Sequence, residues 1–271
     1  MEYAELAAPP PLDTLVRCFW FLRGDDLGPD PQVIVPDGRL EIILHLGEPF
    51  LRHDQGNRYQ QGEVLLSGQL TAPIRLSAGG TTDIVGIRFR TAAARAVLAL
   101  PLGELTDRVE ALSDVAPGLA QSLKTAAART HGPVARVAAL SGVLGRYVVR
   151  EPDPLAAAAI RSLSALHAPR VSHIAKAYGV TARTLERHVR NNAGLPPNVM
   201  RRLLRFRRAF RMLDQAPTGT WAGVAARAGY FDQAHLIRDF RQFAGAAPSE
   251  FFGTSPDLAR AILAGEEAVT T

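Results

Sequence analysis

Cysteine, lysine and long apolar runs are scarce in this chain. Its 271 residues include one cysteine, Cys18, and two lysines beside 29 arginines. A single cysteine excludes an internal disulfide and favours a reducing compartment. No apolar run approaches the roughly 18–20 residues of a membrane helix, and the first residues lack the basic and apolar regions of a signal peptide. We therefore expect a cytoplasmic protein without a membrane span, long enough for two domains.

Motifs for common enzyme classes and metal sites are missing as well. The chain has no Gly-x-Ser-x-Gly, no P-loop and no dinucleotide-binding glycine pattern. Glu41 and His45 share a strand face and could ligate a metal, but the cupin pattern of two histidines followed by a glutamate is absent. His53 and His131 supply no convincing third ligand. We expect no enzyme, no cofactor and no metal.

The net charge of +5 is unevenly distributed. Residues 1–150 hold 15 basic and 16 acidic residues, whereas residues 151–271 hold 16 and 10. Between Arg170 and Arg211 there are 11 basic residues and one acid, Glu186. Such a patch attracts a polyanion through charge neutralisation and counterion release. The excess of arginine over lysine also suggests a GC-rich genome, so the evidence is the placement of the arginines rather than their number.

A helix-turn-helix pattern lies inside this basic region, in the stretch VSHIAKAYGVTARTLERHVRNNAGLPP from Val171 to Pro197. The stretch predicts a short helix, a turn at Gly179 and a second helix capped by Thr181. Leu185 and Val189 lie four residues apart and point inward. The opposite face carries Arg183, Glu186, Arg187 and Arg190. An apolar stripe backed by arginines suits a recognition helix in a DNA major groove, although an ordinary solvated helix pair has the same pattern.

The pattern recurs downstream, which favours DNA binding over the solvated pair. Gly179 matches Gly229 at a spacing of 50 residues. From the pair Leu185 and Leu236 to the pair Pro197 and Pro248, the matches keep a spacing of 51, so the second turn has gained one residue.

At these residues the chain resembles the C-terminal domain of the AraC/XylS family of bacterial transcription regulators. The resemblance covers roughly Pro154–Phe252. It rests on the Gly-Leu-Pro-Pro exit of the first motif, the arginine-rich connecting helix Asn198–Leu213 and the stretch AARAGYFDQAHLIRDFRQFAGAAPSEF. It implies an all-α, homeodomain-like domain with two helix-turn-helix units, one long connecting helix and both recognition helices on the same side.

The resemblance also implies which residues meet DNA. In this family, early positions of each recognition helix contact the base edges. At such positions Arg can pair with guanine, Gln with adenine and Glu with cytosine. The base-reading candidates are Arg183, Glu186, Arg187, Gln233, Ala234, His235, Ile237 and Arg238. The phosphate-contact candidates, which would set affinity and register, are Thr181, Arg190, Arg201, Arg202, Arg205, Arg208 and Arg241. His188, beside Val189, is expected to pack rather than to read.

Short segments with period-two alternation before residue 90 predict strands, and together a β-sandwich or barrel-like domain. The predicted strands are Leu15–Leu22, Val33–Val35, Arg39–Leu46, Glu63–Ser67, Ala72–Ser77 and Asp83–Arg90. The first 13 residues contain Pro9, Pro10 and Pro11, and we expect them to form a loose arm.

This region has a resemblance of its own, carried by CFWFLRG, VPDGRLEIILHLG, LLSGQLTAPIRL and DIVGIRFR. It resembles the N-terminal domain of one branch of AraC-type regulators, to which the resemblance assigns no function. Its strand content is similar to that of the sugar-sensing β-barrel in another branch, although the motif order differs. A small-molecule effector is therefore a hypothesis, with candidate residues Arg39, Glu41, His45 and Arg88. A purely structural, salt-bridged face is the alternative.

From Ala92 onward the apolar period becomes helical and predicts helices at Ala92–Leu100, Gly118–Arg129 and Pro133–Val149. The apolar face of the last helix either packs on the β-domain or forms a homodimer seam. Glu151–Pro154 ends that helix and marks a linker. The predicted fold class is α+β with two domains. Residues 1–150 form a β-rich sensory or dimerising domain with following helices, residues 154–256 the DNA-binding domain, and residues 257–271 a terminal helix or tail.

The chain is therefore predicted to be a sequence-specific transcription regulator that places two recognition helices in successive major grooves of double-stranded DNA. It would then recruit RNA polymerase as an activator, or exclude it. Two alternatives stay open. A DNA-repair alkyl-transfer protein would use Cys18 as its acceptor, although an apolar strand favours an inert thiol there. An effectorless architectural binder would bind random and operator DNA equally.

Overall fold

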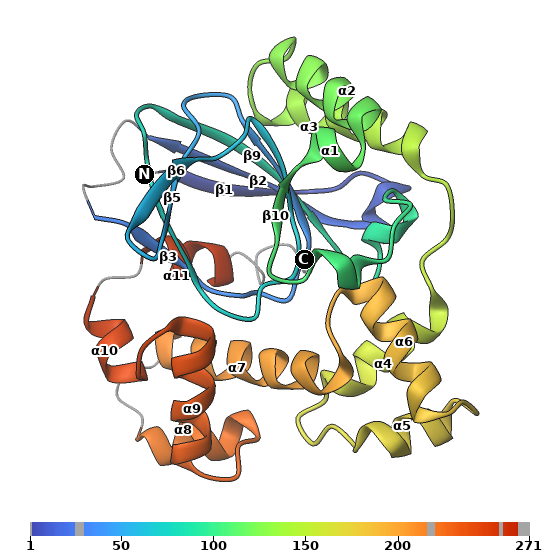
Figure 1. The fold of residues 1–271 in the computed structure, drawn as a ribbon, viewed down its shortest axis with the longest axis vertical. Helices are drawn as coiled ribbons and strands as arrows, with labels where there is room; N and C mark the ends of the chain where they lie inside the picture. The colour runs from blue at the N-terminus through green and yellow to red at the C-terminus, as the bar shows by residue number, and fades with distance from the viewer. Residues whose placement is uncertain (1, 25–29, 216–219, 255–256, 265–271) are drawn as a thin grey trace.

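The first half of the chain folds into two antiparallel sheets (Figure 1). The computed structural model describes residues 2–24, 30–215, 220–254 and 257–264. The larger sheet contains, in spatial order, β1 (Glu2–Ala7), β2 (Val16–Gly24), β9 (Thr82–Phe89), β4 (Glu41–His45), β7 (Val64–Ser67) and β10 (Val109–Ala111). The smaller sheet contains β3 (Gln32–Ile34), β8 (Ile74–Ser77), β5 (Leu51–Asp54) and β6 (Asn57–Gln60).

The alternation in the sequence places the core of the larger sheet. Ile42 of β4 pairs with Ile87 of β9, and both side chains are fully buried. Leu44 and Val85, two residues away on each strand, form a second buried pair of the same kind. Residues two apart in a strand face the same side, so one apolar face of the sheet is available for helices.

Two expectations for this domain were wrong, and three strands were missed. The segment from Glu2 to Ala7 is strand β1, paired antiparallel with β2, and not a loose arm. The strand ends at Ala7, before Pro9, so the prolines do not interrupt its pairing with β2. The hairpin of β5 and β6 and the short strand β10 were not predicted. The expected helix Ala92–Leu100 is reduced to the 3-10 turn η2 (Ala94–Ala96), because Ala92 has a φ of +70°, which no helix accepts.

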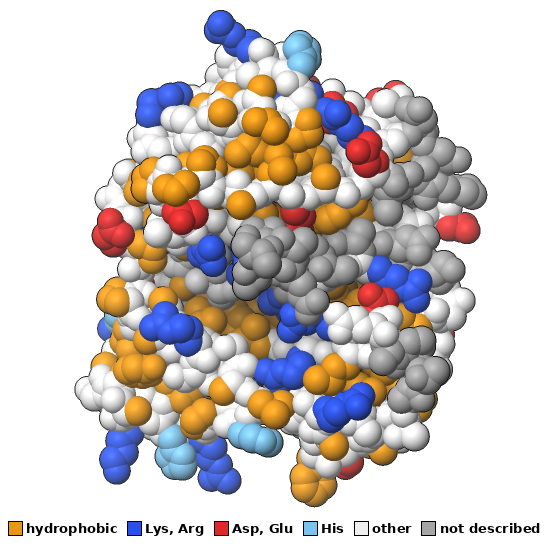
Figure 2. Space-filling view, turned by 180° about the vertical axis from the view of Figure 1, so that it is seen from behind, with side chains coloured by type: hydrophobic (Ala, Val, Ile, Leu, Met, Phe, Trp, Pro, Cys, Tyr) orange, Lys and Arg blue, Asp and Glu red, His pale blue; other side chains and the backbone are white. Residues whose placement is uncertain are grey.

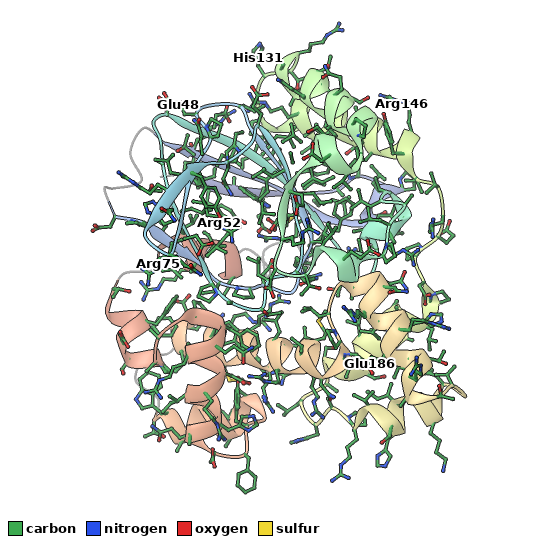
Figure 3. The ribbon with its side chains drawn as sticks, in the orientation of Figure 1. Glu48, Arg52, Arg75, His131, Arg146 and Glu186 are labelled. Atoms are coloured by element: carbon green, nitrogen blue, oxygen red, sulfur yellow. The ribbon has the colours of Figure 1, made fainter. Side chains whose placement is uncertain are left out.

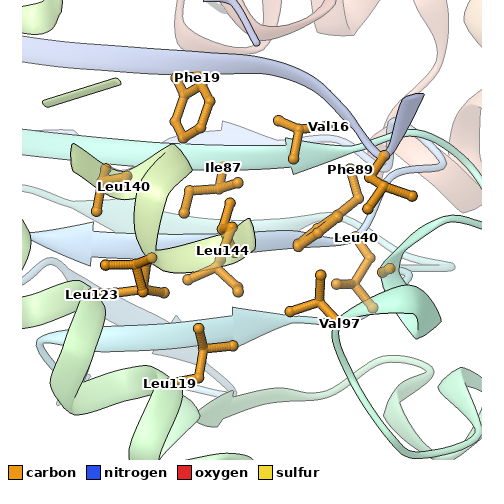
Figure 4. Close-up of a cluster of buried hydrophobic side chains, with 14 of the residues drawn as sticks. Val16, Phe19, Leu40, Ile87, Phe89, Val97, Leu119, Leu123, Leu140 and Leu144 are labelled. Atoms are coloured by element: carbon orange, nitrogen blue, oxygen red, sulfur yellow. The ribbon is translucent and has the colours of Figure 1, made fainter. Parts of the chain in front are cut away.

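Helices cover the apolar face of the larger sheet. They are α1 (Leu112–Val115), α2 (Pro117–Ala128) and α3 (Pro133–Tyr147). Leu119 and Leu123 of α2 and Leu140 and Leu144 of α3 belong to one buried apolar cluster with residues of the strands, among them Phe19 and Ile87 (Figure 4). The apolar face of α3 is therefore used inside the chain. A homodimer seam through the same face would need side chains that are already buried.

The second half is all-helical and, apart from its last helix, lies below the sheets in Figure 1. Its helices are α4 (Pro154–Leu163), α5 (Val171–Ala177), α6 (Ala182–Ala193), α7 (Pro197–Gln215), α8 (Trp221–Ala228), α9 (Gln233–Ala244), α10 (Pro248–Gly253) and α11 (Asp257–Ala264). Helix α7 spans the domain between the two helix-turn-helix units and buries an aromatic cluster against α9 and α10. Its Phe206 and Phe210 meet Phe240 at centroid distances of 4.9 and 6.3 Å.

The two domains touch at both ends of α7. At one end η3 (Leu102–Leu105) lies against α6, where the Thr106 hydroxyl donates to the Gly194 carbonyl at 2.6 Å. At the other end α11 lies between β3 and α7. Leu258 of α11 joins an apolar cluster of the β-domain, whereas Leu263 joins the core of the helical domain. Residues 265–271, the rest of the expected tail, lie outside the described residues.

Candidate nucleic-acid interface

The first recognition helix, α6, starts at a well-formed cap. Gly179 has a φ of +67°, which glycine adopts without strain and which turns the chain from α5 toward α6. The Thr181 hydroxyl accepts a hydrogen bond from the backbone N–H of Thr184 at 3.1 Å. Leu185 and Val189 are fully buried. The opposite face of α6 is therefore the one that can meet a ligand.

That opposite face presents all four charged candidates to solvent. The exposed residues are Arg183, Glu186, Arg187 and Arg190, and Glu186 is labelled in Figure 3. With Pro101, Gly103 and Glu104 they line a cleft of about 610 Å³. The reading face of α6 thus borders an open cleft whose other wall belongs to the β-domain.

The second recognition helix, α9, repeats this construction. Gly229 has a φ of +86°, and the carboxylate of Asp232 accepts from the backbone N–H of His235 at 2.7 Å. Leu236 and Phe240 are fully buried. The candidates Gln233, Ala234, Arg238 and Arg241 are exposed, whereas His235 and Ile237 are half-buried. Both recognition helices thus carry polar candidates on the face away from their apolar stripes.

His235 is already engaged within the domain. Its Nε2 accepts a hydrogen bond from the Arg205 guanidinium at 2.8 Å, and the same guanidinium lies 4.3 Å from the centre of the Tyr230 ring. Burial and the nearby Arg205 charge lower the pKa of His235, which favours the neutral imidazole that this hydrogen bond requires. A contact from His235 to a base would therefore come from its other nitrogen.

A buried carboxylate joins the connecting helix to α9. Asp239 is 1% exposed. It accepts from Arg202 Nη2 at 2.7 Å and Nε at 3.0 Å on one oxygen, and from Arg205 Nη2 at 3.0 Å on the other. Two of the predicted phosphate contacts thus fix the angle between α7 and α9 as well. Sequence reasoning missed Asp239, although an acid next to Phe240 in a buried helix stripe was a usable signal.

Three connecting-helix arginines converge on one side of α7. Arg208 donates to the Ala228 carbonyl at 3.1 Å and to the Ser164 carbonyl at 2.6 Å. Arg201, Arg205 and Arg208 line a pocket of about 250 Å³ together with the loop after α4 and Gly229. This pocket lies between the loop that follows α4 and the turn of the second helix-turn-helix unit.

His188, expected to pack, does more than fill space. Its Nδ1 lies 2.8 Å from Asp153, the residue that caps α4 and accepts from the backbone N–H of Ala156 at 2.8 Å. Asn192 donates to the same carboxylate at 3.3 Å and accepts from Arg95 of the β-domain at 3.4 Å. The linker, the β-domain and the first recognition helix thus meet at one polar cluster.

The candidate effector residues form two groups that share Glu41. Arg88 is fully buried, and its guanidinium donates to Glu41 at 2.6 Å and to Glu5 at 2.8 Å. Burial opposes the charge on Arg88, but Glu41 and Asp37 raise its pKa well above the ordinary value. Arg88 thus belongs to an internal ion cluster with Glu5 and Glu41.

The other group lines a cavity of about 80 Å³ in the β-domain, where Arg39, Glu41 and His45 meet mostly apolar side chains. The wall includes Leu258 from α11. Burial lowers the pKa of His45, whose Nδ1 lies 2.9 Å from the Gly62 carbonyl. Among the described residues, no group of three or more His, Cys, Asp or Glu side chains could hold a metal ion. No helix among the described residues of the whole chain is long and apolar enough to cross a membrane.

Comparisons with known families match both halves of the chain. Residues 4–111 match a family described as a domain of unknown function (DUF6597). Residues 174–254 match a family described as a helix-turn-helix domain. No curated protein matches the chain.

Solved structures of similar shape include three of ToxT from Vibrio cholerae. A 1.65 Å structure has 12% sequence identity and a TM-score of 0.46, covering 86% of this chain and 97% of that chain. The apo form of a ToxT variant has 14% identity, the same TM-score and the same two coverages. Wild-type ToxT bound to an unsaturated fatty acid has 12% identity and a TM-score of 0.43, covering 85% and 94%.

The helix-turn-helix match and the two capped units define a class, the DNA-binding transcription regulators, whose members are typically not enzymes. Within that class, the chain joins an AraC-type helix-turn-helix domain to an N-terminal domain of the DUF6597 type.

Proposed function

We propose that this protein reads DNA at two successive major grooves, with α6 in one and α9 in the other, and thereby recruits or excludes RNA polymerase. The observation that carries the proposal is the matched exposure of the two recognition helices. Leu185 and Leu236 are fully buried at equivalent positions, while Arg187 and Arg238 are exposed at the next equivalent positions.

The charge around these helices supports the same proposal. Seen from behind, Lys and Arg side chains gather over the lower, helical half of the molecule and along its boundary with the β-domain (Figure 2). Such a surface releases counterions when it meets DNA, so binding should weaken steeply with salt. Recognition helices on one face of a duplex lie about 34 Å apart, one helical turn.

The proposal is tested by selecting binding sites from a randomised duplex pool with the wild-type chain and with Arg187→Ala and Arg238→Ala. Each variant should lose about 1–3 kcal/mol of binding free energy and relax preference at its own base position. The two positions should lie about one helical turn apart.

Arg146→Ala is a matched control, since Arg146 is an exposed arginine on α3 of the β-domain (Figure 3). It removes the same charge and should change neither the affinity nor the selected sequence. If both recognition-helix variants bind more weakly but select the wild-type sequence, the arginines contact phosphates and do not read bases.

The structure weighs against the alkyl-transfer alternative. Cys18 is fully buried, and burial raises its pKa from 9.0 to about 12. A thiol that stays protonated and has no access to solvent is a poor nucleophile. Methyl transfer to Cys18 after incubation with methylated DNA would nevertheless restore that alternative. The architectural alternative predicts equal affinity for selected and random duplexes in the experiment above.

We also keep a small-molecule effector as part of the proposal, with Arg39, Glu41 and His45 as the polar end of its site. The cavity of about 80 Å³ is smaller than the roughly 150 Å³ engineered cavity that binds benzene. A sugar would require α11 to move, because Leu258 forms part of the wall. A saturable effect of such a ligand on operator affinity, abolished by Glu41→Gln, would support this part of the proposal.

A further inference from the structure

The turn of the second helix-turn-helix unit holds the most exposed large apolar side chain among the described residues. Phe231 is 93% exposed and directly precedes Asp232, the N-cap of α9. Large apolar side chains are usually buried, because contact with water is unfavourable for them. Phe231 also lies at the N-terminus of a recognition helix, so its position indicates a contact with a partner outside the chain.

The two helix-turn-helix turns differ by this one residue. In the first unit the backbone N–H of Val180 donates to the Ala175 carbonyl at 3.0 Å, and the cap of α6 follows at once. In the second unit the N–H of Tyr230 makes the same bond to the Ala225 carbonyl, at 2.8 Å. Phe231 is therefore the additional residue between the turn and the cap. The first unit closes its turn without such a residue, so the turn itself does not require Phe231.

The residues on both sides of Phe231 are anchored. Tyr230 is 6% exposed, and its ring meets the His235 ring edge-on with the centroids 5.2 Å apart. The Arg205 guanidinium lies 4.3 Å from the centre of the Tyr230 ring. On the other side, the carboxylate of Asp232 accepts from the backbone N–H of His235 at 2.7 Å. The backbone at Phe231 is thus held at both ends, so a contact made by its ring costs little ordering of the turn.

We propose that Phe231 contacts the C5-methyl group of a thymine in the major groove that α9 occupies, and so adds a preference for thymine beside the bases that α9 reads. The inference rests on the proposed function, because it requires α9 to lie in a major groove. The N-terminal residues of a recognition helix meet the base edges. The thymine methyl is the apolar group that those edges present, and phenylalanine is one of the side chains that contact it.

The surroundings of Phe231 favour DNA over a protein partner. The next two side chains along the chain, Asp232 and Gln233, are exposed and polar, and Arg238 is exposed farther along the same helix. The central residue of a protein–protein interface is surrounded by further contacts that exclude water. An aromatic ring followed by polar and basic groups matches a base edge that lies next to phosphates.

Replacing single thymines of the selected binding site by deoxyuridine tests the proposal. Each replacement removes one methyl group and keeps the hydrogen-bonding groups of the base pair. For the wild-type full chain, one replacement in the α9 half of the site should weaken binding about fourfold, the value of one buried methyl group. Phe231→Ala should bind the thymine duplex about fivefold to tenfold more weakly. The same replacement should then have no further effect on this variant.

Two other variants calibrate the result. Phe231→Leu keeps a smaller apolar contact, so its affinity should fall between those of the wild type and Phe231→Ala. Val134→Ala is the matched control, because Val134 is 75% exposed on α3 of the β-domain, and it should change neither the affinity nor the uracil effect. The unfolding temperatures of all variants are compared, and Phe231→Leu replaces the Ala variant if the latter does not fold.

Two results would overturn the proposal. The first is a set of uracil replacements that weaken the wild type nowhere in the α9 half, or that weaken the wild type and Phe231→Ala equally. The second is a Phe231→Ala variant that keeps the wild-type affinity and selected sequence, which would leave the ring to a protein partner. Both results leave the proposed function standing if Arg187→Ala and Arg238→Ala still relax their own positions. A wild-type chain that selects no sequence would refute the proposed function and this inference together.

Discussion

The substitution Asp239→Asn tests whether the helical domain depends on one buried carboxylate. Asp239 is 1% exposed and accepts three hydrogen bonds from Arg202 and Arg205, at 2.7 to 3.0 Å. Asparagine has nearly the same shape but carries no charge and has only one acceptor oxygen. Both guanidinium groups would keep their charges without the carboxylate that compensates them.

Breaking a buried ion pair on one side costs about 3–5 kcal/mol. The Arg202 side chain is 35% exposed, so water screens part of its interaction and the lower value, about 3 kcal/mol, is the better expectation. For a chain of this size, a loss of about 3 kcal/mol corresponds to roughly 6–12 °C in the midpoint of thermal unfolding. The angle between α7 and α9 should also loosen, so operator affinity should fall while the preference read by α6 remains.

Asp232→Asn is the matched control on the same helix. Asp232 is the exposed N-cap of α9, and Asn caps helices about as well as Asp. Its unfolding midpoint should stay within about 2 °C of the wild type. If Asp239→Asn shifts the midpoint no more than Asp232→Asn does, the buried carboxylate is not what ties α7 to α9.

Three further predictions use other features of the fold. Gly179→Ala should lower the free energy of unfolding by about 1 kcal/mol from its positive φ alone, whereas Gly229→Ala should lower it more, because its Cβ would lie 2.8 Å from the Leu166 carbonyl. Equal losses for the two variants in urea unfolding would show that this contact does not matter. Because burial raises the pKa of Cys18 to about 12 in the folded chain, the unfolded thiol loses its proton first, so stability should fall as pH rises above about 9. Cys18→Ala should reduce this fall without abolishing it, because burial also raises the pKa values of Tyr3 and Tyr230. The fragment 154–256 should fold and keep its DNA sequence preference in a gel shift, and a folded fragment without preference would contradict the domain assignment. Extension to residue 264 should raise the thermal unfolding midpoint of the fragment, because it adds the buried Ala259 and Leu263.

The helical domain could be predicted closely because its signals are local. Caps, turns and apolar stripes lie within a few residues of the helices they define. The predicted Thr181 cap is present, and the connecting helix predicted at Asn198–Leu213 is found at Pro197–Gln215. The exposed faces of both recognition helices follow from the same periodicity.

The parts that escaped prediction depend on partners far along the chain. Strand β1 exists because β2 offers it an edge, and nothing in the residues before Pro9 shows that edge. The ion pairs of Arg88 with Glu5 and Glu41 join strands that lie far apart in the sequence. Single side chains in non-local clusters carry no periodic signal.

The contacts at the two ends of α7 have a consequence for operator architecture. At one end Thr106 holds Gly194, and at the other α11 lies between β3 and α7, so the β-domain acts as a brace across the span that separates α6 from α9. If α6 and α9 read two grooves as proposed, a protein held in this way would not follow a change in the spacing between them. One added base pair rotates the second major groove by about 35° around the duplex axis. The twist would have to be absorbed by the DNA, and the stiffness of the intervening base pairs would become part of the recognised sequence.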